Sequence, residues 1–406
     1  MQSLWYGMRY GRRVVGLSGM VLNKLAPMLR WSFRHNMVAI LVLGGYVALA
    51  FALSRIFDFP LELHIYNDAL LITVGTVLVV YATTISVRTV WIHRPSRPIT
   101  FLLPRLTGVH RVPHRVIMAL PVLLLLPLFF SAFTSVKSAI GVVNPYNWDR
   151  AFMELDAYLH GGTAPWILLQ FVANPLLTFG LAFFYNLWFV VMITVLVIAV
   201  FAIDRPKLRS QYLVAFLLAW TILGTVGAIL FASMGPCFYD LAYPGEKNPF
   251  TPLLAYLNEV NQTYPVWALT AQDMLRDYYL ANRPGFGAGI SAFPSMHIAV
   301  VVLNAILGWQ LSRKVGWFLT IFAAFIMIGS VHLGWHYAVD AYASALAIPF
   351  VWKLSGVIVE YWYSRESEAD VTNHACGAVV PAGKTSGTKG NARPLDGAPH
   401  GISGLR

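Results

Sequence analysis

The sequence predicts an all-α, polytopic membrane protein, a bundle of about eight transmembrane helices. Two observations favour this class. Of the 406 residues, 57% are hydrophobic and only 12% are charged, whereas an average soluble domain carries about 25% charged residues. The apolar residues also gather in runs of about 20, the length that crosses a bilayer as a helix. The net charge of +11 arises mainly from Lys and Arg between these runs, so a nucleic-acid-binding surface is not expected.

Eight apolar runs are long enough to be membrane spans. They lie at about 37–57, 69–90, 116–136, 176–203, 211–232, 294–312, 315–333 and 338–360. The shorter run 165–174 precedes Pro175 and is expected to be interfacial or re-entrant. Residues 264–280 have apolar side chains at helical spacing, which predicts a helix lying on the outer surface.

Lys and Arg are distributed unevenly between the predicted loops. With eight spans, the loops richest in these residues and both termini fall on the same side, which the positive-inside rule makes cytoplasmic. We therefore expect an integral protein of the inner or plasma membrane with cytoplasmic termini. The loop 233–293 is then periplasmic or luminal. The two cysteines, Cys237 and Cys376, do not predict a disulfide framework.

Three ionisable side chains are predicted to meet at the outer end of the bundle. His297 opens the sixth span, in the stretch SAFPSMH (291–297), and His336 and Asp340 open the eighth, in HYAVD (336–340). His336 and Asp340 are four residues apart and share a helix face. Because spans six to eight run antiparallel, all three groups reach the same leaflet. Ionisable groups at that depth indicate a functional site.

These stretches resemble the type 2 phosphatidic acid phosphatase superfamily, whose second and third signatures are PSGH and SR-x5-H-x3-D. Pro294–His297 has Met in place of Gly, and His336 and Asp340 match the end of the third signature. The resemblance is closer to the branch of inositol-phosphorylceramide synthases and their bacterial relatives, in which SAFPSMH-like and HYxVD-like stretches occur together. GPCFYD (235–240) and NLWF (186–189) also resemble that branch.

Two departures from the family pattern concern phosphate binding. Gly329 and Ser330 stand where the third signature has Ser-Arg, so that signature's arginine is absent. The first signature, K-x6-RP, is matched only by Arg276-x6-Arg283-Pro284. Arg276 and Arg283 are among the few cations on the predicted outer side. A phosphate needs charged donors, so these two are the candidates for binding it.

The resemblance covers about 145–350 and implies a six-helix phosphatase-type core preceded by two additional spans. The expected segments are a basic cytoplasmic or interfacial N-terminal segment (1–36), two spans with a cytoplasmic loop (37–115), the catalytic membrane domain (116–360) and a tail (361–406). The tail is rich in Gly, Ala, Pro, Thr and Ser, and this composition predicts a disordered cytoplasmic segment.

The resemblance further implies two-step phosphoryl transfer through a phosphohistidine. His336 is the expected nucleophile, and Asp340 orients its ring and stabilises its charge. His297 is expected to protonate the leaving lipid alkoxide and then to act as base on the acceptor hydroxyl. Ser295 and the backbone N–H groups at the start of the sixth span are expected to bind a phosphate oxygen. The scheme requires no metal or other cofactor.

The acceptor decides between two enzyme activities. A hydroxylated lipid acceptor, such as ceramide, makes the protein a transferase of a phosphoinositol-type headgroup from a glycerophospholipid donor, whereas water makes it a lipid phosphatase. Tyr239 and Asp240, in GPCFYD, are expected at the substrate site. Asp149, Asp156 and Asp240 lie in outer loops and are candidates to bind inositol hydroxyls, although such residues more often cap helices or are solvated.

Two other classes remain open. In the first, His332, His336, Asp340 and His297 form a metal site, because imidazoles four residues apart suit zinc; activity that survives a strong chelator would exclude it. In the second, the protein is a non-enzymatic lipid-binding or transporter-like protein whose polar groups line a substrate path. Considered alone, His332 is expected to be a buried residue that bonds to a neighbour.

Overall fold

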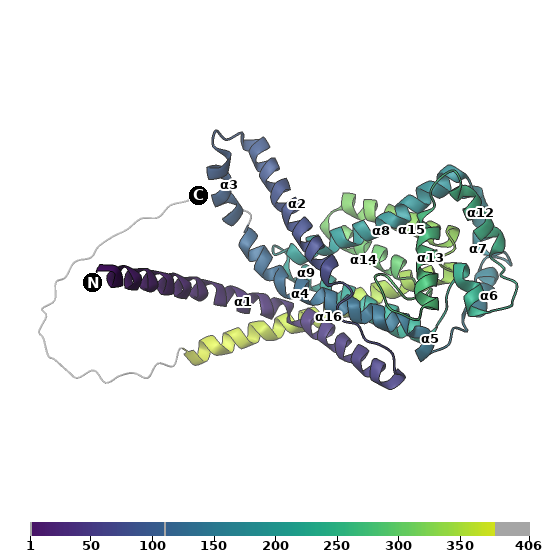
Figure 1. Cartoon of the computed structure of the whole chain (residues 1–406), viewed down its shortest axis with the longest axis horizontal. Coiled ribbons are helices and arrows are strands. Elements are labelled where there is room, and N and C mark those ends of the chain that lie inside the picture. Colours follow the sequence, from purple (N-terminus) through teal and green to yellow (C-terminus); the bar gives the residue numbers. More distant parts are fainter. Residues whose placement is uncertain (1, 109–110, 378–406) are drawn as a thin grey trace, which may run out of the picture. The chain divides into compact units, whose positions relative to one another are not determined.

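The structure, a computed structural model, describes residues 2–108 and 111–377, with side chains described from about residue 26 to residue 365. This part of the chain contains helices and loops and no strand, which confirms the predicted all-α class. Its helical bundle belongs to one compact unit, Met1–Trp362. Figure 1 shows the order of the helices.

Each predicted span coincides with a helix. Within the described residues, six helices are long and apolar enough to cross a membrane, so this is an integral membrane protein. They are Ala26–Phe57 in α1 (Gln2–Phe57), Val112–Ser138 (α4), Pro175–Phe201 (α8), Pro206–Leu230 (α9, η2 and α10), Arg313–His332 (α15) and Ala338–Arg365 in α16 (Ala338–Gly377). The other two predicted spans are α2 (Asn67–His93) and α14 (Met296–Leu311); α14 has only 16 residues.

The ends of these helices follow local sequence signals. Proline is at the first helical position of α8 and α9, where its missing N–H costs no hydrogen bond. Asn174 caps α8, because its side-chain oxygen accepts from the backbone N–H of Leu176 at 2.9 Å. A π-helical segment, η2 (Ile222–Gly227), connects α9 (Pro206–Thr221) to α10 (Ala228–Leu230).

The first span begins earlier than the sequence predicted, because its polar side chains face another helix. Ser32 Oγ donates to the carbonyl of Ile117 at 2.7 Å, and Asn36 Nδ2 donates to the carbonyl of Met118 at 2.9 Å. Both side chains are buried between α1 and α4. Because these polar groups face a neighbouring helix and not lipid, this part of α1 can lie within the membrane span.

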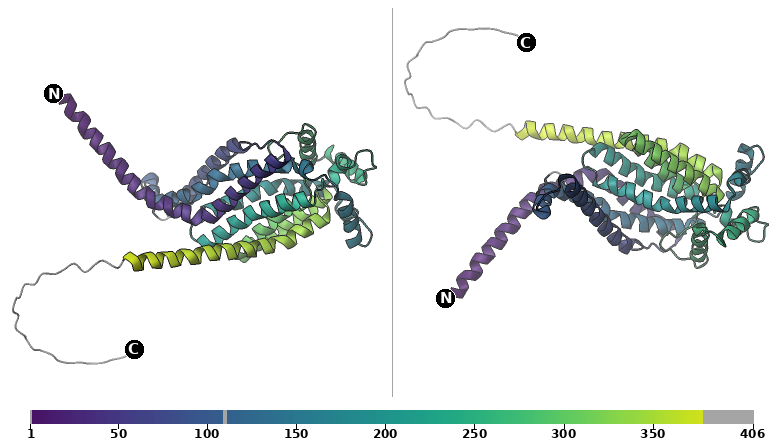
Figure 2. Two further views of the ribbon diagram at one scale, coloured as in Figure 1. Left: turned by 90° about the horizontal axis from the view of Figure 1, so that it is seen from below. Right: turned by 90° about the horizontal axis from the view of Figure 1, so that it is seen from above.

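The shorter helices gather at one end of the bundle. They include α5 (Ile140–Val143), α6 (Asp149–Leu159), α7 (Pro165–Leu168), α12 (Thr251–Asn261) and α13 (Trp267–Leu280), and the views in Figure 2 agree with this placement. The helix predicted for 264–280 is therefore confirmed as α13. The run 165–174 forms two short helices, α7 and η1 (Leu169–Val172), and does not span. Beside these lie η3 (Pro236–Phe238) and α11 (Tyr239–Ala242), whereas α3 (Pro98–Thr107) follows α2.

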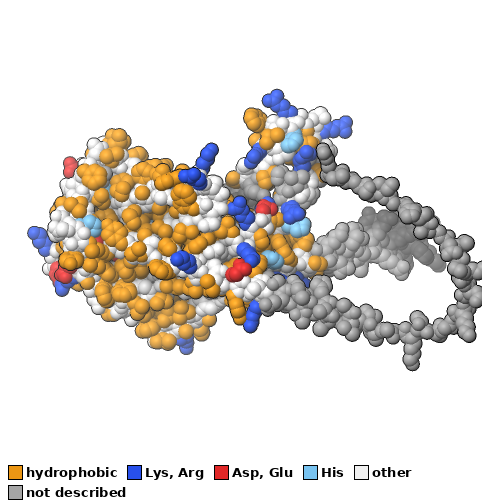
Figure 3. Space-filling view, turned by 180° about the vertical axis from the view of Figure 1, so that it is seen from behind, with side chains coloured by type: hydrophobic (Ala, Val, Ile, Leu, Met, Phe, Trp, Pro, Cys, Tyr) orange, Lys and Arg blue, Asp and Glu red, His pale blue; other side chains and the backbone are white. Residues whose placement is uncertain are grey.

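The outer surface of the bundle is apolar over the face shown in Figure 3, with Lys and Arg side chains near its ends. Large exposed hydrophobic side chains come from four different spans, for example Leu124, Ile198, Phe318 and Leu346. A soluble protein rarely exposes a contiguous apolar surface of this extent. The surface is therefore suited to contact lipid chains.

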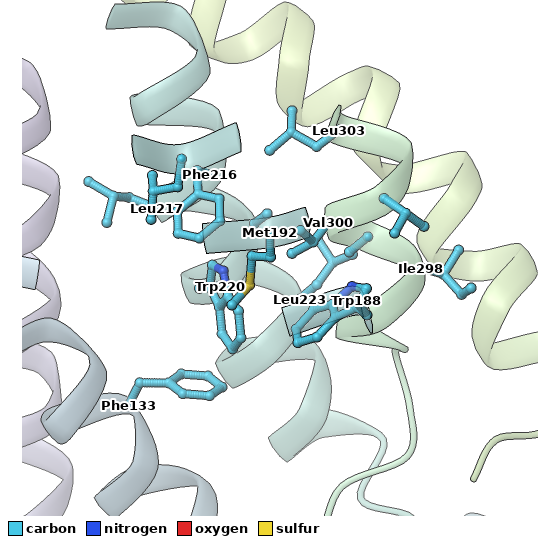
Figure 4. Packing of buried hydrophobic residues seen from close by; sticks show 14 of the residues in the cluster. Phe133, Trp188, Met192, Phe216, Leu217, Trp220, Leu223, Ile298, Val300 and Leu303 are labelled. Carbon is cyan, nitrogen blue, oxygen red and sulfur yellow. The ribbon is translucent and has the colours of Figure 1, made fainter. Parts of the chain in front are cut away.

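Aromatic side chains from several spans pack together in the interior. Phe133 of α4 meets Trp220 of α9 edge to face, with ring centroids 4.8 Å apart, and Trp188 of α8 lies in the same cluster (Figure 4). Such pairs are stabilising beyond the area that they bury. This cluster lies directly against the candidate site described below.

The first part of the predicted tail is helical. Helix α16 continues past residue 360 to Gly377. Residues 361–377 contain no proline, and their only glycine is the last residue, so nothing in this stretch interrupts a helix. The rest of the predicted tail, 378–406, lies outside the described residues.

Candidate active site

His336 and Asp340 form a buried pair where α15 is connected to α16. His336 lies in the loop before α16, and Asp340 lies in its first turn. The distance from His336 Nδ1 to Asp340 Oδ2 is 3.3 Å. The backbone N–H of Tyr337 also donates to Asp340 Oδ2, at 3.0 Å. The spacing of four residues therefore places the carboxylate on one ring nitrogen of the histidine.

His297 lies beside this pair, at the start of α14. Its ring centroid is 5.8 Å from that of His336. Trp188 Nε1 donates to the His297 carbonyl at 3.0 Å, and the Tyr185 ring stacks on the His297 ring at 4.6 Å. The structure thus brings together His297, His336 and Asp340, as the sequence predicted for the ends of these spans.

Ser295 connects the starts of α14 and α16. It is the N-cap of α14, fully buried, and its hydroxyl accepts from the backbone N–H of Ile298 at 3.5 Å. Its own backbone N–H donates to the carbonyl of Asp340 at 3.3 Å. This contact fixes the histidine of one helix relative to the carboxylate of the other.

A cavity of about 310 Å³ contains both histidines. Its wall is largely aromatic and aliphatic and includes Tyr66, Phe130, Phe133, Tyr185, Trp188, Trp220, Phe238, Met296 and Trp335. Figure 4 shows three of these, Phe133, Trp188 and Trp220, close together. An apolar wall around a few polar groups is typical of a ligand site. Here it fits the reacting end of a lipid.

Lys137 is a cation of this cavity that the sequence analysis did not identify as a site residue. It lies in the last turn of α4 and lines the cavity with His297 and His336. Its ammonium group acts electrostatically on both imidazoles. It has no carboxylate partner in the described part of the chain. A bound anion would supply that partner.

A sequence signal for Lys137 exists. Lys137-x6-Asn144-Pro145 keeps the spacing of the first signature, K-x6-RP, with Asn in place of Arg. Asn144 Nδ2 donates to the carbonyl of Ile229 at 2.6 Å, so this position holds the turn after α5 against α10. The match at Arg276-x6-Arg283-Pro284 has the arginine and the proline of the signature but Arg in place of its lysine.

Asp156 caps the helix that carries Asp340. Its two carboxylate oxygens accept from the backbone N–H groups of Ala338 and Val339 at 2.8 and 2.9 Å. Burial raises the pKa of Asp156, and these hydrogen bonds lower it again in part. Asp156 therefore occupies the capping role that the sequence analysis gave as the commoner alternative to inositol binding.

Asp149 holds the neighbouring loop from the same helix, α6. Its oxygens accept from the backbone N–H groups of Met234 and Gly235 at 3.0 and 2.7 Å and from the Tyr337 hydroxyl at 3.1 Å. Gly235 has a φ of +92°, and a Cβ there would lie 2.6 Å from the carbonyl oxygen of Trp335. Only glycine fits this close approach to the loop that carries His336.

Four other predicted substrate-binding residues do not line the cavity that contains the histidines. Arg276 makes a bidentate pair with Asp240, at 2.9 and 3.1 Å. Tyr239 is buried and packs its ring against Tyr243 at 4.8 Å. Arg283 lines a separate cavity of about 420 Å³, which shares Gly289 with the first.

His332 is a buried structural histidine, as the sequence predicted. Its Nε2 lies 2.9 Å from Thr178 Oγ1, which also contacts the Tyr256 hydroxyl at 2.9 Å. Among the described residues, no three His, Cys, Asp or Glu side chains are grouped so that they could hold a metal ion. The alternative zinc site therefore has no counterpart in this part of the chain.

A membrane bundle that brings two histidines, a carboxylate and a lysine to an apolar cavity is suited to phosphoryl transfer on a lipid. The family model described as the PAP2 superfamily matches residues 150–353, about half of the chain, and the protein belongs to this superfamily. Its members are phosphatases or phosphotransferases, so the protein is an enzyme of this kind. No curated protein and no solved structure matched the chain.

Proposed function

We propose that the protein transfers a phospho-headgroup from a glycerophospholipid to a hydroxylated lipid through a phosphohistidine on His336. The observation that carries this proposal is the geometry of the cavity. His336 has a carboxylate on Nδ1 at 3.3 Å and a second imidazole with its centroid 5.8 Å away. The resemblance of 291–297 and 336–340 to inositol-phosphorylceramide synthases favours a phosphoinositol-type headgroup and a ceramide-like acceptor.

In the first step, His336 Nε2 attacks the phosphorus of the donor. The N–P bond forms, and the P–O bond to the diacylglycerol oxygen breaks. Asp340 holds the proton on Nδ1 and stabilises the positive charge that develops on the ring. His297 donates a proton to the departing oxygen. Lys137 and the backbone N–H groups of Met296 and His297, in the first turn of α14, bind the negative oxygens.

In the second step, the acceptor hydroxyl attacks the same phosphorus. His297, now neutral, removes the proton from this hydroxyl, and the N–P bond breaks to regenerate His336. Water in place of the acceptor would give a phosphatase. The apolar wall of the cavity supports a lipid acceptor, because a lipid hydroxyl arrives with chains that this wall can bind.

The site is proposed to face the periplasm or lumen, with both termini in the cytoplasm. This assignment rests on the Lys and Arg residues of the loops on the other side, at 94–115, 205–209 and 313–314. The starts of α14 and α16, with His297 and Asp340, lie at the opposite ends of those spans.

Incubation of the purified protein with 32P-labelled phosphatidylinositol, with and without ceramide, tests the proposal. Labelled lipid product that forms only with ceramide supports transfer, whereas a labelled water-soluble product without ceramide indicates a hydrolase. His336→Ala should bind the donor and give neither product. A His336→Ala protein that turns over at the wild-type rate would refute the assignment of the nucleophile.

A further inference from the structure

The cavity lacks the arginine that the third signature supplies for phosphate. Gly329 and Ser330 occupy those positions, and Asn144 replaces the arginine of the first signature. Among the described residues that line the cavity, Lys137 is the only Lys or Arg. Stabilising a transferring phosphoryl group takes several donors aimed at its non-bridging oxygens. Other side chains must then provide them.

Two buried donors flank the histidines. The Tyr185 hydroxyl and the Trp335 indole Nε1 have no hydrogen-bond partner among the described residues, and both side chains line the cavity. An indole N–H can only donate, and a buried donor without an acceptor is costly. Such donors at the wall of a cavity indicate that a ligand provides the acceptor.

Ring packing fixes both donors beside the reacting groups. The Tyr185 ring stacks on the His297 ring at 4.6 Å and lies nearly parallel to the Trp335 ring, at 8° and 6.2 Å. Trp335 directly precedes His336, and its backbone N–H donates to the Ser330 carbonyl at 3.0 Å. Packing therefore holds both side chains beside the two histidines.

We propose that the Tyr185 hydroxyl and the Trp335 N–H donate hydrogen bonds to the non-bridging oxygens of the transferring phosphoryl group, in place of the missing arginine. This inference rests on the proposed phosphoryl transfer in the same cavity. Neutral donors suit an apolar cavity better than a second cation, because an unpaired charge is far more costly to bury than a neutral N–H or O–H.

The same donors define a substrate class. The charge of the protonated His297 is offset by that of Asp340, so one lysine with two neutral donors matches the single negative charge of a phosphodiester. A phosphomonoester such as phosphatidic acid approaches a charge of −2 at neutral pH, and one cation leaves part of that charge unpaired. The site should therefore prefer phosphodiester lipids as donors over phosphatidic acid.

The test uses full-length protein in detergent with Tyr185→Phe, Trp335→Phe and, as matched control, Tyr243→Phe. The Tyr243 hydroxyl is also buried, but it lies outside the cavity. We expect Tyr185→Phe and Trp335→Phe each to slow single-turnover phosphoenzyme formation from phosphatidylinositol by about 10²-fold. Tyr243→Phe should stay within about twofold. Size-exclusion profiles and thermal transitions identify any variant that fails to fold.

Calorimetric titration with inorganic orthovanadate separates this inference from the identity of the lipid. Wild type and Tyr243→Phe should bind vanadate, and Tyr185→Phe and Trp335→Phe should bind it about tenfold more weakly or worse. Equal binding by all the proteins, no binding by wild type, or an equal loss in Tyr243→Phe would overturn the inference. So would a faster phosphoenzyme formation from phosphatidic acid than from phosphatidylinositol.

Discussion

The carboxylate of Asp340 lies 3.3 Å from Nδ1 of His336, the residue four positions before it in the sequence. Both side chains are buried, and the backbone N–H of Tyr337 holds the same carboxylate oxygen at 3.0 Å. With Nδ1 engaged, the other ring nitrogen is the one available for attack on a substrate. Asp340 is therefore expected to affect the rate of phosphohistidine formation, which can be measured separately from binding of the donor lipid.

Asp340→Asn should slow phosphohistidine formation by about 10³-fold, because the amide keeps the shape of the side chain and loses the charge that orients and stabilises the ring. Donor binding, measured with a fluorescent phospholipid, should change less than about threefold. A rate within about tenfold of wild type would remove Asp340 from the mechanism.

Lys137→Gln should lower kcat/KM for a phospholipid donor by about 10²-fold, since among the described residues it removes the only Lys or Arg that lines the cavity. Lys247→Gln is the matched control, because Lys247 is exposed and lies outside both cavities. It should stay within about twofold. Equal effects of the two substitutions would show that Lys137 acts only through the overall charge of the protein.

The proposed nucleophile, His336, should remain active in mildly acidic solution. Burial lowers the pKa of His336 from its ordinary value near 6.5 to about 3. The neutral, reactive ring is therefore retained as the pH falls and is lost only as the pH drops through about 3. Phosphoenzyme formation from a phosphodiester donor, whose charge does not change in this range, should show no loss between pH 7.5 and 5. A loss of about 30-fold that follows a pKa near 6.5 would contradict this account.

Asp156→Asn should destabilise the protein by about 1–2 kcal/mol, because an amide can accept only one of the two hydrogen bonds that cap α16. Phosphoenzyme formation should slow as well, since the capped turn carries Asp340. Glu154→Gln, an exposed position on the same helix, should change the free energy of unfolding by less than about 0.5 kcal/mol. Chemical denaturation in detergent measures both variants. A variant Asp156→Asn as stable and as fast as Glu154→Gln would show that the cap is dispensable.

The central part of the site was predictable because two local motifs mark the starts of two helices. The proline and serine before His297 begin α14, and HYAVD begins α16, so the antiparallel order of the spans brings His297, His336 and Asp340 together. The bundle was predictable for a similar reason, because each span is an uninterrupted apolar run.

The rest of the cavity depends on packing that no local pattern reports. Lys137 lies about half a chain away from His336 and lines the candidate site only when α4 packs beside α8 and η2. Tyr185 lies inside an apolar run, where an aromatic residue is ordinarily a packing residue. Asp149 and Asp156 lie in a segment between spans, and only the folded chain shows that their partners are backbone N–H groups of Met234 and Ala338, in the loops next to His336 and Asp340.

The most direct test of the account is to locate the phosphoryl group in the trapped intermediate. The protein is mixed with labelled donor, quenched in alkali, in which phosphohistidine survives, and digested for mass spectrometry. The account predicts the phosphoryl group on His336 and none in His336→Gln. With a donor whose leaving group needs no proton, the intermediate should accumulate in His297→Ala, because His297 is then required only for the second step. A phosphoryl group on His297 or on another residue, or turnover without any phosphoenzyme, would contradict it.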